Sequence, residues 1–164
     1  METEEEKKVY QHLNSRNITF VTHKHPPVYT VDEAKAFWEG IPGQHCKNLF
    51  LRDKKGRNHF LVVLLHDKKL DIKKLSRQIG SDTLSFASSS RLMKYLGVEP
   101  GSVTPLGIIN DKEKKVQVIV DKDLLDGDTV NVHPNINTRT ITLKIDDFRK
   151  FLDNSGNRVR YLEL

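Results

Sequence analysis

The chain has little cysteine and no long apolar run, and each of these shortages excludes a class of protein. Cys46 is the one cysteine among 164 residues, so an intramolecular disulfide is excluded and a reducing compartment is expected. No stretch approaches the roughly 20 apolar residues that span a bilayer, and we expect no membrane partner. Residues 1–8 are acidic and polar, unlike a secretory signal or an Arg-rich transit peptide. The cytosol is therefore the expected location.

Metal-ligand spacing is also missing, although the chain holds seven histidines. It has neither paired CxxC segments nor HExxH. His45 and Cys46 are consecutive, so on an extended segment their side chains point to opposite sides, which argues against a catalytic Cys–His pair. We expect no metal, and we interpret Cys46 as a small packing residue.

The overall composition is typical of one soluble domain, and the charge is distributed unevenly along the sequence. Hydrophobic residues make up 37% and charged residues 30%, and no repeat, low-complexity segment or long linker divides the chain, so we predict a single domain over residues 1–164. Residues 47–94 hold twelve basic and four acidic side chains, net +8, between flanks of net −2 and −1. Such a block is typical of a polyanion partner, although a solvated lysine-rich face has the same signature.

Capping residues and apolar spacing predict four or five helices and about six or seven strands, drawn from five helical and eight strand-like segments. Helices are expected after Thr3, Thr30 and Asp71, after the serines at 88–90, and from Asp146. Strands are expected at residues 18–21, 48–51, 59–65, 84–87, 103–109, 116–120, 129–132 and 140–144. Two of the strand pairs, 48–51 with 59–65 and 103–109 with 116–120, are predicted hairpins, so the sheet cannot be all parallel. The predicted fold is α/β of the α+β kind, with a curved mixed sheet.

Three positions could carry chemistry. Lys47 lies between a Gly/Pro loop and the strand at 48–51, where a lysine can hold a phosphate, polarise a carbonyl or act as a nucleophile; an ordinary strand-edge lysine is the alternative. The glycine-bearing segment 101–107 could offer backbone N–H groups to an oxyanion, or it could be a plain turn. His133 ends a strand and could serve a substrate oxygen or a water, or only cap a neighbouring carbonyl.

Five short segments occur together in one order: HPPVYT at 25–30, GQHCKNLFL at 43–51, LMKYLG at 92–97, PGSVTP at 100–105 and VHP at 132–134. In combination they resemble the YbaK-like, prolyl-tRNA-synthetase-associated editing domain. The likeness extends from about residue 4 to about residue 152 and is greatest to the freestanding alanyl-tRNA(Pro) deacylases. It implies a barrel-like mixed sheet with flanking helices. It also implies hydrolysis, without a cofactor, of the ester that joins a wrong amino acid to the 3′ end of a tRNA.

The resemblance assigns roles to particular residues. Lys47 matches the essential lysine of the family, and it is expected to anchor the terminal adenosine or its phosphate, or to polarise the ester. Asn48, Gly101 and His133 match other pocket positions, and His133 is expected to hold the amino-acid end or the ribose. Tyr29 and Thr30 match the segment that lines the amino-acid pocket.

Further expectations rest on the same resemblance. The backbone N–H groups near Gly101 and Ser102 are expected to stabilise the developing oxyanion. The basic block is expected to lead an acceptor stem to the pocket, through Lys54, Lys55, Lys73, Lys74, Arg91 and Lys94.

The implied partner is mischarged tRNA(Pro) rather than DNA, and prolyl-tRNA synthetase is a second candidate partner. Relatives differ in the amino acid removed, so alanine, cysteine, serine and threonine all stay open, with alanine preferred. A protein that keeps the fold but only binds tRNA or a synthetase is the alternative, and the intact set of Lys47, Gly101 and His133 favours an enzyme.

Overall fold

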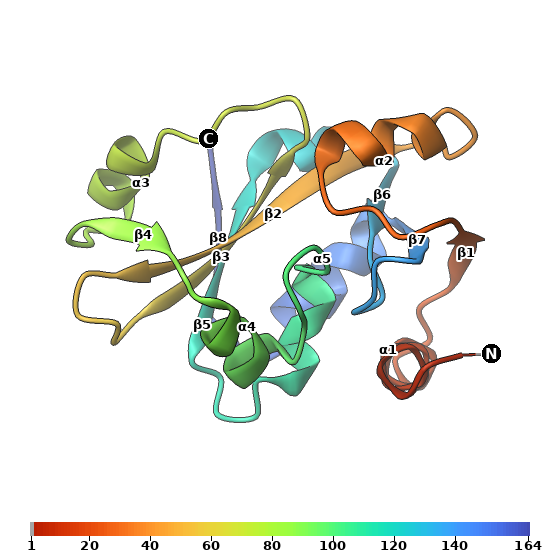
Figure 1. The fold of residues 1–164 in the computed structure, drawn as a ribbon, viewed down its shortest axis with the longest axis horizontal. Coiled ribbons are helices and arrows are strands. Elements are labelled where there is room, and N and C mark those ends of the chain that lie inside the picture. Colours follow the sequence, from red (N-terminus) through yellow and green to blue (C-terminus); the bar gives the residue numbers. More distant parts are fainter. Residues whose placement is uncertain (1) are drawn as a thin grey trace.

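Helices and strands alternate along the chain and assemble one mixed sheet in this computed structural model, which describes residues 2–164 (Figure 1). The helices are α1 (Glu4–Ser15), α2 (Val31–Trp38), α3 (Ile72–Ile79), α4 (Ser89–Leu96) and α5 (Ile145–Asp153), with the 3₁₀ helices η1 (Pro105–Asn110) and η2 (Lys122–Asp126). The strands are β1 (Phe20–Lys24), β2 (Gln44–Asp53), β3 (His59–Leu65), β4 (Leu84–Phe86), β5 (Val116–Asp121), β6 (Thr129–Val132), β7 (Arg139–Lys144) and β8 (Val159–Leu162).

The helices α1, α2, α3 and α4 begin directly after a predicted capping residue, whereas α5 begins at Ile145 without a side-chain cap. The Thr3 side chain accepts from the Glu6 N–H and the Glu6 carboxylate accepts from the Thr3 N–H, which completes a capping box at α1. At α3 the cap is simpler, because the Asp71 side chain accepts one hydrogen bond, from the Lys74 N–H. Gly80 ends α3 with a φ of 67°, in the left-handed region that favours glycine.

Strand β2 joins the two halves of the sheet. The strand order is β1-β7-β6-β2-β3-β5-β8, with β4 paired to β2 off this path. β2 runs antiparallel to β3 along most of its length but pairs with β6, in parallel, only at Gln44 and His45. The sheet is thus mixed, as predicted, and its two halves are held together through the first residues of β2.

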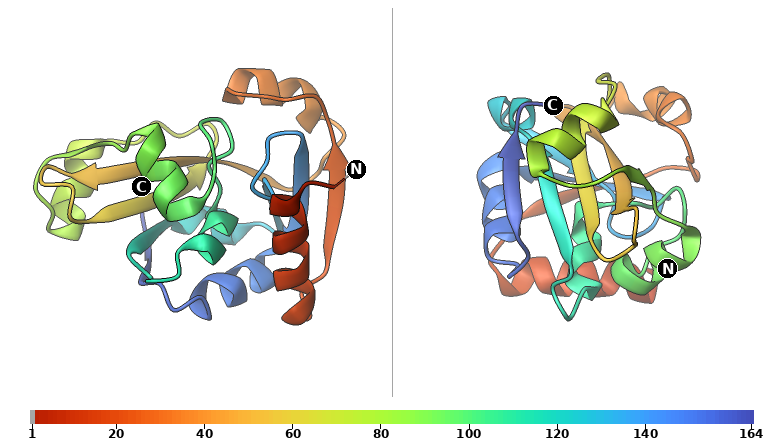
Figure 2. Two further views of the ribbon diagram at one scale, coloured as in Figure 1. Left: turned by 60° about the horizontal axis from the view of Figure 1, so that its bottom comes forward. Right: turned by 90° about the vertical axis from the view of Figure 1, so that its left-hand side faces the viewer.

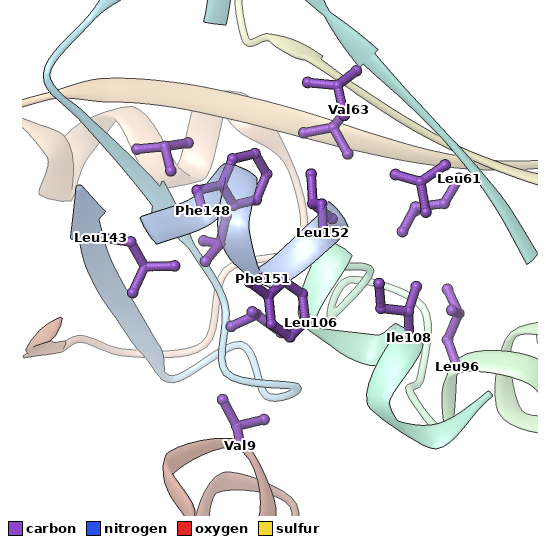
Figure 3. Close-up of a cluster of buried hydrophobic side chains, with 14 of the residues drawn as sticks. Val9, Leu61, Val63, Leu96, Leu106, Ile108, Leu143, Phe148, Phe151 and Leu152 are labelled. Atoms are coloured by element: carbon purple, nitrogen blue, oxygen red, sulfur yellow. The ribbon is translucent and has the colours of Figure 1, made fainter. Parts of the chain in front are cut away.

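The larger core fills the face of the sheet that α1, α4, α5 and η1 cover. Figure 3 shows Phe148 and Leu152 of α5 gathered with Leu143 of β7 and Leu61 of β3. These four side chains are fully buried, and burying each is worth about 1.5–3 kcal/mol. α2 takes no part in this core because none of its residues is buried.

A smaller core lies under α3, where Leu75 packs on Leu51, Phe60 and Leu64. This face of the sheet carries α3 near the β2–β3 turn and α2 at the far end, so the two helices lie at opposite ends of the molecule (Figures 1 and 2). Among residues 2–164, no helix combines the length and the apolarity that a membrane crossing requires.

The predicted hairpin of residues 103–109 with 116–120 is wrong. Pro105 opens the 3₁₀ helix η1 instead of continuing a strand, and the Thr104 hydroxyl caps it by accepting from the Leu106 N–H. β5 then pairs in parallel with β3 and β8, which is a non-local arrangement. β8 and η2 have no counterpart in the prediction, and β1 begins two residues later than expected, at Phe20.

Candidate active site

A cavity of about 280 Å³ opens where β2 and β6 separate. The two strands pair at His45 and Asn131 and then diverge, so Lys47 and His133 face a gap rather than each other's backbone. α2, at the top of Figure 1, contributes four residues to the lining of this cavity: Val31, Ala34, Phe37 and Trp38. The weak parallel pairing between the two halves of the sheet is therefore what creates the site.

The cavity brings together most of the predicted site residues. Lys47, Gly101, His133, Tyr29, Thr30 and Asn48 all line it, and Ser102 does not. The other lining residues are His25, Val28, Val31, Ala34, Phe37, Trp38, Ile41, His45, Cys46, Leu49, Val103, Asn131, Val132 and Thr140. The lining described by the structure holds no aspartate or glutamate, so no carboxylate is at hand as a general base.

Lys47 lies within β2, opposite Leu64 of β3, and not ahead of the strand as predicted. The strand begins earlier, at Gln44, because Gln44 and His45 pair with β6. Within the described residues the Lys47 ammonium makes no hydrogen bond and no ion pair. It is therefore available to an anionic group of a ligand.

Gly101 occupies a tight turn at the rim. Its φ is +90°, and the Ser102 N–H donates to the Glu99 carbonyl oxygen at 3.0 Å, which closes a turn with Pro100 and Gly101 at its centre. A Cβ at Gly101 would lie 2.8 Å from Cδ1 of Tyr29, so the aromatic ring packs directly on the glycine. Because its N–H is used by the turn, Ser102 does not fit the expected role of oxyanion donor; the Gly101 N–H, by contrast, makes no hydrogen bond within residues 2–164.

The ring of His133 is held in one orientation. Its Nδ1 lies 2.8 Å from the Arg139 carbonyl oxygen, which can only accept, so Nδ1 carries the proton. Burial lowers the pKa of His133, and the nearby His25 adds to this effect. The imidazole is therefore neutral near pH 7, and its Nε2 offers a lone pair rather than a proton.

A buried carboxylate stands behind His133. Glu6 of α1 is 1% exposed, and its Oε1 lies 3.5 Å from Nε of Arg139 and 3.0 Å from the Tyr10 hydroxyl. The carbonyl that fixes His133 belongs to this same Arg139, so α1 supports the site from outside the cavity. Nothing in the sequence pattern marks Glu6 beyond its place in a capping box.

Histidine 25 is a further lining residue that sequence reasoning missed as a site residue. Its Nδ1 lies 2.9 Å from the Pro26 carbonyl oxygen and its Nε2 lies 2.8 Å from Oγ1 of Thr140. The ring stacks on Phe37 and lies 6.1 Å, between centroids, from His133. Its place as the first residue of the HPPVYT segment was the one feature of the sequence that could have marked it as a site residue.

Cys46 is unsuited to nucleophilic chemistry. Burial raises the pKa of its thiol to about 12, and the thiol donates to the Asn131 carbonyl oxygen at 3.4 Å. It packs against the larger core, in agreement with its interpretation as a packing residue. Across residues 2–164, no three His, Cys, Asp or Glu side chains are grouped so that they could hold a metal ion.

The predicted tRNA-binding residues lie away from the cavity. Lys54 and Lys55 form the turn between β2 and β3, and Lys73 and Lys74 lie on α3; all four are exposed, and we call them the distal lysines. Their end of the molecule is opposite to α2 (Figures 1 and 2).

The two predicted tRNA-binding residues on α4 have internal contacts. Nη1 of Arg91 lies 3.2 Å from the Gly56 carbonyl oxygen and 2.8 Å from Nε2 of His59, which ties the guanidinium to the fold. Lys94 is exposed, with its ammonium 5.2 Å from the centre of the Tyr95 ring.

Comparison with known proteins agrees with this geometry. The family model of the aminoacyl-tRNA editing domain matches residues 25–151. The prolyl-tRNA editing protein ProX of Acetoanaerobium sticklandii is 41% identical over 164 residues, which is all of both chains. Prolyl-tRNA synthetase associated domain-containing protein 1 of Bos taurus is 36% identical over 138 residues, covering 82% of this chain and 80% of the relative.

The fold is also found in a solved structure of low sequence identity. The hypothetical protein APE2540 superposes with a TM-score of 0.73 at 22% identity, over 94% of this chain and 97% of that one. The chain thus belongs to the aminoacyl-tRNA editing domain family, and the resemblance noted in the sequence is confirmed.

Proposed function

We propose that this protein hydrolyses the ester bond of mischarged tRNA(Pro) in trans, with alanyl-tRNA(Pro) as its main substrate. The observation that carries the proposal is the cavity that collects Lys47, Asn48, Gly101 and His133 around a small apolar recess. The relative named as a prolyl-tRNA editing protein is similar over its whole length, which supports the same class of substrate.

The reaction needs few protein groups because an aminoacyl ester is already activated. The oxygen of a water attacks the ester carbonyl carbon, and the carbonyl electrons move onto its oxygen. When the tetrahedral intermediate collapses, the bond to the ribose oxygen breaks and that oxygen takes a proton. The products are the free amino acid and a tRNA with an intact terminal ribose.

The proposed oxyanion donors are the backbone N–H groups of Gly101 and Asn48. Along β2 the backbone groups of alternate residues face away from β3, and the Phe50 carbonyl oxygen on that side accepts from the Ala87 N–H. The N–H of Asn48 faces the same side, where neither β6 nor β4 pairs with it. Asn48 thereby takes the place that Ser102 cannot fill.

Lys47 and His133 hold the two ends of the substrate. The free ammonium of Lys47 binds the phosphate of the terminal adenosine, which orients the ester. The neutral His133 accepts a hydrogen bond at Nε2 from the substrate ammonium or from the ribose 2′-OH, and a 2′-OH so held can direct the water.

Amino-acid selection is steric in this proposal. Val28, Ala34, Trp38 and Ile41 line the recess with apolar surface. Such a wall accepts a methyl group and rejects the ring of proline, whereas its discrimination between alanine and serine is limited to about 10–200-fold. Cognate prolyl-tRNA(Pro) is therefore spared.

Deacylation assays test the proposal directly. We expect rapid ester loss from alanyl-tRNA(Pro), slower loss from its cysteinyl, seryl and threonyl forms, and none from prolyl-tRNA(Pro). Lys47→Ala should nearly abolish turnover while Lys8→Ala, an exposed site on α1, leaves it unchanged. Full activity in Lys47→Ala would refute the assigned role. Tight binding of tRNA(Pro) or of prolyl-tRNA synthetase without hydrolysis of any of these esters would instead support a non-catalytic binding module.

A further inference from the structure

One face of β2 carries both cavity-lining side chains and the neighbour of an exposed aromatic ring. Lys47, Leu49 and Leu51 alternate onto one face of β2, and the first two line the cavity. Phe86 of β4 is paired with Leu51, so its side chain lies on this same face. At a rise of about 3.3 Å per residue, the pairing places Phe86 ~13 Å along the strand from Lys47.

Phe86 contributes little to the core. Its side chain is 61% exposed, whereas Leu84, two residues earlier on the same face, is buried in the smaller core. A lone exposed apolar residue is common on protein surfaces. The notable property of Phe86 is its position, next to the buried Leu51 on the face of β2 that carries Lys47 and Leu49 at the cavity.

The edge of β2 just beyond the cavity has no strand paired to it within residues 2–164. Pairing with β6 ends at His45, and the Phe50 carbonyl oxygen already accepts from the Ala87 N–H beside β4, so among the described residues only 46–49 have no strand on this edge. Proteins usually cover or blunt such an edge. Here an extended ligand that leaves the cavity can run along it.

The surroundings of this path suit a polyanion. Residues 46–52 and 83–98 contain no acidic side chain, and their basic residues are Lys47, Arg52, Arg91 and Lys94. Basic side chains together with an exposed aromatic ring are the means by which proteins bind single-stranded nucleic acid without reading its sequence.

We propose that Phe86 is a stacking platform for the unpaired nucleotides that precede the terminal adenosine of the bound tRNA. This inference rests on the proposed function, because it takes the terminal adenosine to lie at Lys47. The open edge of β2 then guides the single-stranded 3′ tail from the cavity to the ring of Phe86, and the paired acceptor stem begins beyond it.

The test combines a substitution with substrate truncation. Phe86→Ala should lower kcat/KM for alanyl-tRNA(Pro) by roughly 5- to 150-fold, the effect of losing one base–aromatic stack. It should leave hydrolysis of 3′-O-alanyl-adenosine unchanged, because that substrate ends before the platform. Phe86→Trp should retain activity on the tRNA and Phe86→Leu should not, whereas Val21→Ala, at a residue of similar exposure on β1, should change neither substrate.

Binding measurements separate this inference from the proposed function. Phe86→Ala should weaken the binding of uncharged tRNA(Pro) with an intact 3′ tail and should not affect a tRNA whose tail has been removed, even if the protein hydrolyses no ester. Equal effects of Phe86→Ala on the tRNA and on alanyl-adenosine would overturn the platform, as would no effect on either. Unchanged tRNA binding with weakened binding of prolyl-tRNA synthetase would overturn it in favour of a protein-docking role.

Discussion

Replacing Gly101 by alanine tests how much the backbone conformation at the rim of the cavity, and how much the contact with the Tyr29 ring, contribute to activity. The glycine has a φ of +90°, a backbone angle that residues with a side chain rarely adopt. An added Cβ would also lie 2.8 Å from Cδ1 of Tyr29. The backbone therefore resists the substitution, and the aromatic ring resists it as well. The two effects can be told apart, because moving the Tyr29 side chain relieves the contact but does not relieve the backbone strain at position 101.

The expected magnitudes differ for stability and for activity. A left-handed backbone costs a non-glycine residue about 1–2 kcal/mol. The contact adds little, because the Tyr29 ring is 66% exposed and free to swing outward. If the turn rotates to relieve the backbone, the Gly101 N–H leaves the site, and losing one oxyanion donor lowers kcat by about 10²–10³-fold.

Denaturant unfolding and single-turnover deacylation measure these two effects. Gly80→Ala is the matched control, since Gly80 also has a positive φ, of 67°, with no atom within 4 Å of its would-be Cβ. Gly80 caps the end of α3, which lies at the opposite end of the molecule from α2. It should lose similar stability and keep full activity. The double variant with Tyr29→Ala should stay inactive; recovery there would show that the ring contact, and not the backbone, was at fault. Full activity in Gly101→Ala alone would refute the oxyanion role.

Three further perturbations probe charge. Replacing the four distal lysines by alanine should weaken tRNA binding and flatten its dependence on salt, and an unchanged affinity and slope would identify them as a solvated face. Since burial lowers the pKa of His133, kcat/KM should be flat above pH 6.5 and should fall as pH drops below it, a dependence that His133→Asn should remove. Burial first, and then the charge of Arg91, lower the pKa of His59 to about 4. The unfolded chain thus binds the proton more readily, and stability measured in urea should decline from pH 6.5 to about 4 by up to about 3 kcal/mol in the wild type but not in His59→Asn.

Local signals were sufficient for the helices. Capping by Thr3, Thr30, Asp71 and Ser88 is visible in the sequence and present in the structure, because a cap and its helix involve residues three positions apart. The hairpin of β2 with β3 was predicted for the same reason, since its turn lies between the two strands.

Non-local pairing limited the prediction of the sheet. The run Val103–Ile109 has the composition of a strand, yet Thr104 and Pro105 start a 3₁₀ helix that packs Leu106 into the core. β8 is short and pairs only with β5, some 40 residues away, so nothing near it in the chain marks it as a strand. A one-dimensional pattern cannot report which neighbour a strand will find.

The site also has a part that the sequence predicts and a part that depends on non-local packing. Six of the seven predicted catalytic and substrate-binding residues line one cavity, because the family segments carry them. The hydrogen bond from Ser102 to Glu99 and the support of His133 through Arg139 by Glu6 needed coordinates, because each depends on where a loop or a helix packs. Their roles in catalysis stay predictions until the variants are measured.

The net charge of residues 47–94 overstates the cations that a tRNA can reach. Lys68 pairs with the buried Asp121 at 2.9 Å, Arg91 donates to Gly56 and His59, and the Arg52 guanidinium donates to backbone carbonyl oxygens of the nearby turn. Among the other cations, Lys47 lies in the cavity and the distal lysines lie at the opposite end of the sheet. Arg57, Lys69, Arg77 and Lys94 are exposed as well. A phosphate bound at Lys47 lies beyond a Debye length of ~10 Å from the distal lysines at 0.1 M salt. Affinity for the acceptor stem and catalysis at the ester are therefore separable, and variants of the distal lysines should raise KM without lowering kcat.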